Sequence, residues 1–145
     1  EGKVHAFPPL PEGGRLPEID RSYRLDENPM RFGSLWIRSG GDRVHLSFDD
    51  GRSIQTVEAK TGCWTVNQCD MRYVQPALGG HHPGEDRERL VMAVSCGEEE
   101  GKIVLLVRFR TSPHTQRWEI EAGGEGLRMS FAEPEGPEGE CLTGR

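Results

Sequence analysis

Apolar and polar residues alternate along most of the chain between residues 21 and 131. The alternation has a period of two in the segments 44–48, 103–109, 118–120 and 127–131. Successive side chains of a β-strand point to opposite faces, so this pattern predicts strands with one face on a core and the other toward water. No window of a dozen residues shows the period of 3.6 that an amphipathic helix requires. The pattern therefore predicts an all-β domain.

Short polar segments that contain glycine separate the predicted strands, as is typical of hairpins between antiparallel strands. These connecting segments are 39–42, 49–52, 97–101 and 123–126. Further strands are predicted at 21–25, 34–38, 53–58, 71–75 and 90–96. Eight or nine strands in sequential hairpins predict an antiparallel up-and-down meander. Such a meander can close into a lipocalin-like barrel or fold into a sandwich, and either limits exposed strand edges.

Prolines and glycines concentrate at the two ends of the 145-residue chain. Residues 1–20 contain four prolines, which lack the N–H that a sheet needs, so this segment is predicted to be a linker or strap. The alternative is a disordered terminus. Residues 132–145 contain four glutamates and three glycines with little to bury, which predicts a disordered acidic tail. A single β domain, 21–131, is expected between them, and the start at Glu1 suggests a fragment of a longer protein.

Charge and composition narrow the class of partner. The net charge is −6, which opposes binding to nucleic acid and to anionic membranes. No apolar run approaches the length of a membrane span. The 19 glycines and 10 prolines are too many for a helical bundle and agree with a turn-rich β protein.

The cysteine spacing does not indicate a metal site. Cys63 and Cys69 are the only close pair, and zinc sites usually combine two pairs of ligands at short spacing. A disulfide between these two cysteines is an alternative. The simpler interpretation is that all four cysteines are free thiols in a reducing compartment, which predicts a cytoplasmic location and no cofactor.

No catalytic residue is predicted from sequence motifs. The chain has neither Gly-x-Ser-x-Gly nor Ser-x-x-Lys, the usual settings of a nucleophilic serine. Ser34, Ser47 and Ser95 lie on predicted strands, where serine commonly fills space or faces solvent, and His45 lies on the polar face of its strand. The carboxylate pairs lie in glycine-flanked turns, where they serve solubility.

Two groups of large side chains are candidates for binding. Trp36 faces opposite to Leu35 and Ile37, so it marks either a docking surface or a site covered by the N-terminal strap. If a barrel encloses a void, a ligand pocket is expected; a filled interior is the alternative. The residues expected to line that pocket are Trp64, Met71, Tyr73 and Met92.

The long segment 76–89 interrupts the alternating pattern and is predicted to be a loop. Long loops in compact domains are often functional. A third hypothesis is therefore a small stand-alone enzyme that uses this loop for acid–base or metal chemistry. Its candidate residues are His81, His82, Glu85 and Asp86.

Several segments together resemble the β-domain that follows the catalytic domain in many bacterial serine hydrolases of the beta-lactamase and penicillin-binding-protein-like superfamily. The resemblance lies in Tyr23–Met30 with Leu35–Arg38, Gly62-Cys63-Trp64, Val104–Phe109, Thr111-Ser112-Pro113, Gln116–Glu121 and Gly126–Phe131. It spans roughly residues 21–131 but not the stretch from Cys69 to Arg89.

The resemblance implies a non-catalytic accessory domain that shapes the cleft of a catalytic domain or mediates assembly. The family's catalytic serine, lysine and tyrosine lie in the other domain, and no position here matches them. The implied partner is therefore a serine-hydrolase-like catalytic domain or another copy of this chain. A lipocalin-like barrel that binds a small apolar ligand is the main alternative.

Overall fold

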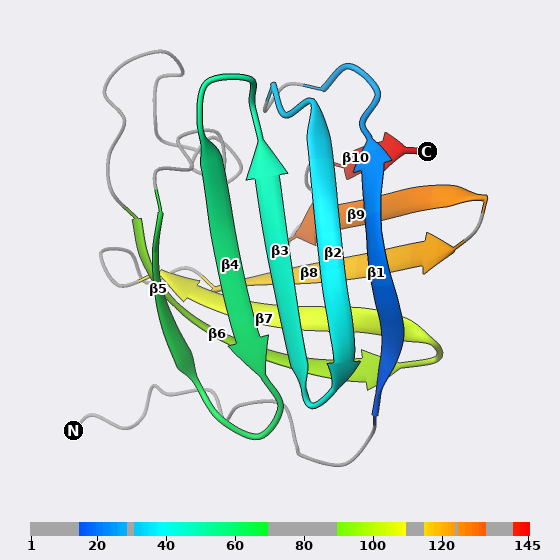
Figure 1. Cartoon of the computed structure of the whole chain (residues 1–145). Helices are drawn as coiled ribbons and strands as arrows, with labels where there is room; N and C mark the ends of the chain where they lie inside the picture. Colours follow the sequence, from blue (N-terminus) through cyan, green and yellow to red (C-terminus); the bar gives the residue numbers. More distant parts are fainter. Residues whose placement is uncertain (1–14, 29–30, 70–89, 110–114, 124, 133–140) are drawn as a thin grey trace.

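The computed structural model describes residues 15–28, 31–69, 90–109, 115–123, 125–132 and 141–145. These residues form ten β-strands and no helix (Figure 1). The first sheet contains β1 (Leu16–Arg24), β2 (Ser34–Gly41), β3 (Arg43–Asp49) and β4 (Ile54–Lys60). The second contains β5 (Thr65–Cys69), β6 (Leu90–Glu99), β7 (Lys102–Phe109), β8 (Thr115–Gly123), β9 (Gly126–Ala132) and β10 (Cys141–Gly144).

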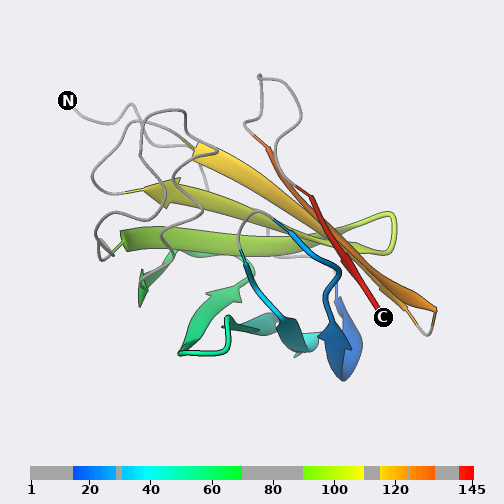
Figure 2. The ribbon, with the colours of Figure 1, turned by 90° about the horizontal axis from the view of Figure 1, so that it is seen from above.

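Both sheets are antiparallel meanders in which each strand pairs with its neighbour along the chain. The orders are β1-β2-β3-β4 and β10-β9-β8-β7-β6-β5. Figure 2 shows the two sheets as separate layers, and in Figure 1 strands β1 to β4 cross β6 to β9. The predicted all-β antiparallel class is therefore confirmed. Among the described residues, no helix is long and apolar enough to cross a membrane.

The predicted hairpin between β6 and β7 has a two-residue turn whose backbone fits the twist of the strands. Glu100 and Gly101 both have positive φ, 54° and 83°. Two successive residues at positive φ are the mark of a type I′ turn, which suits tight hairpins. The backbone N–H of Gly101 also donates a hydrogen bond to Glu98 Oε2 at 2.7 Å.

One hydrophobic core lies between the two sheets and receives every second residue of most strands. On β3, for example, Val44, Leu46 and Phe48 are buried, whereas His45 and Ser47 between them are only half-buried. Two aromatic pairs reinforce the core, each with ring centroids 4.9 Å apart. They are Phe32 with Phe48 and Trp118 with Phe131.

Contacts between the sheets close both sides of the core. On one side, Asn67 of β5 accepts a hydrogen bond from the backbone N–H of Glu58 and donates one to its carbonyl, both at 2.8 Å. On the other side, Arg24 and Arg145 exchange two backbone hydrogen bonds, at 2.8 and 2.9 Å. Each contact satisfies the backbone groups of one residue on an edge strand, Glu58 on β4 and Arg24 on β1, which would otherwise be unpaired.

The structure differs from the sequence prediction in three places. Strand β1 begins at Leu16, so residues 16–20 are sheet rather than linker. Strand β10 lies inside the segment that was predicted to be a disordered tail. The side chain of Leu142 is fully buried, and its burial stabilises the strand against disorder. The described residues contain ten strands rather than eight or nine. The strand predicted at 71–75 and the loop predicted at 76–89 lie outside the described residues.

Candidate functional site

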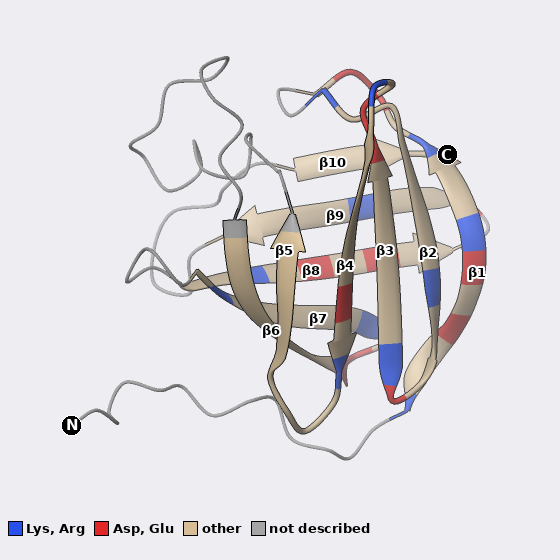
Figure 3. Cartoon of the chain, turned by 60° about the vertical axis from the view of Figure 1, so that its left-hand side comes forward, with Lys and Arg blue, Asp and Glu red and all other residues tan. Residues whose placement is uncertain are grey.

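The outward-facing residues of the first sheet form rows that cross all four strands. In one row, called the charged row below, adjacent strands place residues of alternating character side by side. Its members, in register from β1 to β4, are Asp20, Arg38, His45 and Glu58. Figure 3 shows acidic and basic positions along the four strands of this sheet. Apolar and polar residues alternate along these strands. Because successive side chains point to opposite faces, the apolar residues enter the core and the polar residues line up on the outer face.

Three side chains near the centre of this face form a continuous hydrogen-bonded chain. His45 Nδ1 lies 2.9 Å from Glu58 Oε2, and His45 Nε2 lies 3.1 Å from Ser47 Oγ. His45 and Ser47 are two residues apart on β3, so they share a face, and Glu58 is the cross-strand partner of His45. The order hydroxyl, imidazole, carboxylate is the one that activates a nucleophilic serine.

Trp36 lies in the adjacent row of the same face, and three residues of the charged row contact its side chain. Its Nε1–H donates a hydrogen bond to Asp20 Oδ1 at 2.9 Å, and the Arg38 guanidinium lies 5.4 Å from its ring centroid. The His45 ring meets it edge-on, with centroids 6.4 Å apart. Trp36 remains 38% exposed, which agrees with the predicted outward orientation. The indole is therefore fixed in position while part of it faces solvent.

A depression of about 670 Å³ opens at the end of the sheet where β2 turns into β3. Its lining includes all four residues of the charged row, together with Arg43 and Lys60, which are cross-strand partners. Lys60 and Arg38 have no carboxylate partner within the described part of the chain, and the Arg43 guanidinium lies 3.9 Å from exposed Asp42. The carboxylates of the row, in contrast, already accept hydrogen bonds from Trp36 or contact His45.

Of the four residues predicted to line a ligand pocket, two belong to the described part of the chain, and their environments differ. Met92 is fully buried in the hydrophobic core. Trp64 is half-buried, with the Arg108 guanidinium 5.8 Å from its ring centroid. Met71 and Tyr73 lie outside the described residues, as do the loop candidates His81, His82, Glu85 and Asp86. No group of three potential metal ligands occurs in the ranges that the structure describes.

The described cysteines differ in environment. Cys63 is an exposed free thiol, so the disulfide considered from the sequence is not formed in this structure. Burial, with a smaller contribution from nearby Asp42, raises the pKa of the Cys96 thiol to about 12. Cys96 is therefore protonated and unreactive at neutral pH.

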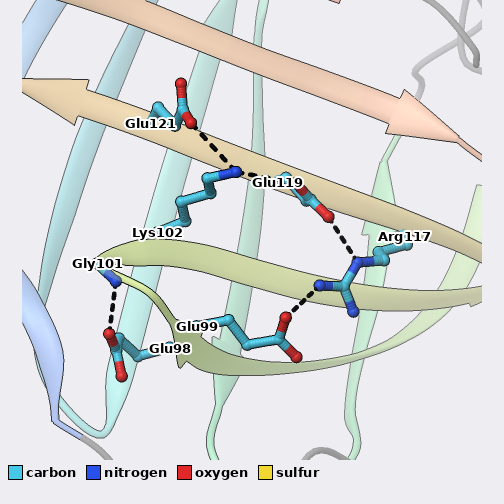
Figure 4. A network of polar contacts seen from close by, with 7 residues as sticks. All are labelled: Glu98, Glu99, Gly101, Lys102, Arg117, Glu119 and Glu121. Carbon is cyan, nitrogen blue, oxygen red and sulfur yellow. Dashed lines mark hydrogen bonds and ion pairs between the residues drawn. The ribbon is translucent and has the colours of Figure 1, made fainter.

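The outer face of the second sheet contains a network of ion pairs that satisfies its own charges (Figure 4). Arg117 bonds to Glu99 at 2.6 Å and to Glu119 at 2.8 Å, and Lys102 lies 3.2 Å from Glu121. Each cation in this network has a carboxylate, unlike Arg38 and Lys60 on the first sheet. The first sheet is therefore the better candidate for binding.

The sequence prediction identified Trp36 but missed the chain from Ser47 to Glu58. The spacing of His45 and Ser47 on one strand face was visible in the sequence. The position of Glu58 was not, because it depends on the register between β3 and β4.

Comparison with known proteins does not identify the chain. No protein-family model matches the sequence, and no curated protein matches it.

Proposed function

We propose that this chain is a non-catalytic accessory β-domain that docks onto a protein partner through the outer face of its first sheet. The observation behind this proposal is Trp36, which is exposed yet fixed by Asp20 and flanked by Arg38. Tryptophan and arginine are the residues most often found at the energetic centres of protein interfaces. A side chain that is already fixed loses little conformational entropy when a partner binds.

The charges of this face favour an acidic partner. The two carboxylates of the charged row, Asp20 and Glu58, already contact Trp36 and His45, whereas Arg38 and Lys60 lack carboxylate partners among the described residues. The chain has a net charge of −6, yet the lining of the depression contains three cations, Arg38, Arg43 and Lys60, beside the carboxylates of Asp20 and Glu58. An acidic surface on the partner would complete these pairs and exclude partners of the opposite charge pattern.

In keeping with the resemblance noted above, the partner that we propose is a serine-hydrolase-like catalytic domain with an acidic docking surface. The architecture that we propose is a partly open barrel whose two sides are closed by Asn67 and by β10. Because the closing contacts lie at the strand edges, the face around Trp36 stays open to a partner.

We also expect that the chain does not catalyse ester or amide hydrolysis with turnover. Strand β3 has hydrogen-bonded neighbours on both sides, so the backbone N–H groups around Ser47 belong to the sheet. They are not available to stabilise an oxyanion, which is usually the largest single contribution to acyl-transfer catalysis.

A binding experiment with a glutamate-rich peptide tests the docking proposal. We expect the peptide to bind the chain and to perturb tryptophan fluorescence, with affinity falling as salt increases. Trp36→Ala and Arg38→Ala should each weaken binding by about tenfold or more, as expected for residues at the centre of an interface. Ile54→Ala, which removes an exposed apolar side chain from β4 of the same sheet, should leave it unchanged.

A lysine-rich peptide of equal length is the matched ligand control. Equal affinity for the two peptides would show that this face does not select an acidic partner. An affinity for the glutamate-rich peptide that is unchanged in Trp36→Ala and Arg38→Ala would show the same.

A further inference from the structure

We infer that Ser47 is a nucleophile that accepts a single acyl group from an activated aryl ester, with His45 as its general base. This inference goes beyond docking and does not depend on it. It rests on the two contacts of the His45 ring, to Glu58 Oε2 at 2.9 Å and to Ser47 Oγ at 3.1 Å.

The two contacts determine which ring nitrogen of neutral His45 bears the proton. A carboxylate can only accept a hydrogen bond, so Nδ1, which faces Glu58, must be the N–H nitrogen. Nε2 is then the unprotonated nitrogen, and it faces the Ser47 hydroxyl. This is the tautomer in which imidazole can remove a proton from serine.

Rigid elements hold these groups in position. His45 and Ser47 project from the same face of β3, which lies between two strands of the sheet. Glu58 lies on β4, whose outer edge is fixed at that residue by two 2.8 Å hydrogen bonds to the Asn67 side chain. Glu58 is therefore a positioning residue, because it acts on Ser47 through His45.

The reaction step is simple and balanced. Ser47 Oγ attacks the carbonyl carbon of the ester, and His45 Nε2 takes the hydroxyl proton. The new Oγ–carbon bond replaces the bond between that carbon and the aryl oxygen. The departing phenolate takes the proton from His45, which returns to its neutral form, and Ser47 is left as an acyl ester.

The reaction stops after this step for a chemical reason. A phenolate is a good leaving group, so acylation can proceed even though the backbone N–H groups of β3 around Ser47 are already bonded to neighbouring strands. The acyl group on Ser47 is an ordinary alkyl ester with a poor leaving group, and its hydrolysis would need the oxyanion stabilisation that this sheet lacks. Stoichiometric acylation is therefore expected rather than turnover.

The test is to treat the full chain with p-nitrophenyl acetate and to locate the acetyl group by tryptic peptide mass spectrometry. Cleavage after Arg43 and Arg52 releases residues 44–52, in which Ser47 is the only hydroxyl side chain and no lysine occurs. We expect one acetyl group on Ser47. His45→Gln should slow this acetylation by about a hundredfold, the lower end of what general-base catalysis contributes.

Matched variants separate chemistry from structure. Ser34→Ala removes another serine of the first sheet and should leave acetylation of Ser47 unchanged, whereas Ser47→Ala should abolish the acetylated peptide. Glu58→Gln should slow the reaction of the folded protein, because a neutral amide stabilises the positive charge that develops on the imidazole less than a carboxylate does. The rate measured for Glu58→Gln reports on His45 even if His45→Gln fails to fold.

An acetyl group found only on lysines or on the amino terminus would overturn the inference. Acetylation of Ser47 at the same rate in wild type and folded His45→Gln would overturn it too, as would an unchanged rate in folded Glu58→Gln. The docking proposal fails by a separate result, loss of selectivity in the peptide experiment, so the two failures are distinguishable.

Discussion

At the scale of single residues, burial decides which side chains can react. Cys96 is fully buried and its thiol pKa is raised to about 12, whereas Cys63 is exposed on the surface. The thiolate is the reactive form of cysteine, so a buried thiol with a raised pKa reacts slowly even when a reagent reaches it.

Thiol labelling should follow this difference. We expect iodoacetamide at neutral pH to modify Cys63 in the native protein and to spare Cys96 until the chain unfolds. Mass spectrometry of peptides that contain each cysteine, with and without denaturant, measures both. Rapid native labelling of Cys96 would contradict its burial.

The ion pairs of the second sheet predict a residue-scale pH dependence. The hydrogen bond from Arg117 to Glu119 is the largest cause that lowers the pKa of Glu119 below its ordinary value of 4.5. A carboxyl whose folded pKa is lowered stabilises the fold above its ordinary pKa, and this stabilisation disappears as the pH falls through the lowered value. Glu119→Gln should therefore lower stability at pH 7 slightly and make stability less sensitive to pH below 4.5. Denaturant unfolding at several pH values tests this, and parallel profiles for the two proteins would refute it.

At the scale of elements, the alternation of buried and exposed positions makes each strand stable. Val57 of β4 is fully buried, whereas Val66 of β5 is 68% exposed. The two residues are chemically identical, so the difference between their contributions to stability comes from their surroundings alone.

Substituting each of these valines with alanine provides a matched comparison. Val57→Ala should destabilise the fold by about 2 kcal/mol, through lost burial of two methyl groups and the cavity that remains. Val66→Ala should change stability by less than about 0.5 kcal/mol, as is usual for surface substitutions. Equal losses of unfolding free energy, measured by urea unfolding, would show that Val57 does not face the core or that Val66 does not face solvent.

Strands with strong alternation were predictable from the sequence, and strands without it were not. The periods in 44–48 and 103–109 correspond to β3 and β7. Strand β5, Thr65–Cys69, has a mostly polar sequence and is short, so no pattern marked it. It forms because β6 pairs with it and because Asn67 bonds to the backbone of β4.

At the scale of the whole molecule, the last strand joins the two sheets. Strand β10 pairs with β9, while Arg145 exchanges backbone hydrogen bonds with Arg24 and Gly144 bridges Leu25. A Cβ atom at Gly144 would overlap the carbonyl oxygen of Arg24, so glycine permits this close approach. The junction was not predictable from the sequence, because local composition suggests disorder and the partners of this segment in the first sheet, Arg24 and Leu25, are more than a hundred residues away.

Leu142→Ala tests whether this junction stabilises the fold. Leu142 is fully buried, so we expect a loss of about 2–5 kcal/mol of unfolding free energy, the usual cost of removing a large apolar side chain from a core. Ile54→Ala, at a 62% exposed position, is the control and should have little effect. Wild-type stability in Leu142→Ala would mean that β10 is dispensable.

We propose that the outer face of the first sheet is the functional surface, and NMR mapping tests that proposal most directly. Backbone amide shifts should be followed while the glutamate-rich peptide is added to the full chain. We predict the largest changes at Trp36, Arg38 and His45 and at Lys60 beside the depression, with those of β7 to β9 nearly unchanged. Changes centred on the second sheet, or spread evenly over the molecule, would contradict the account.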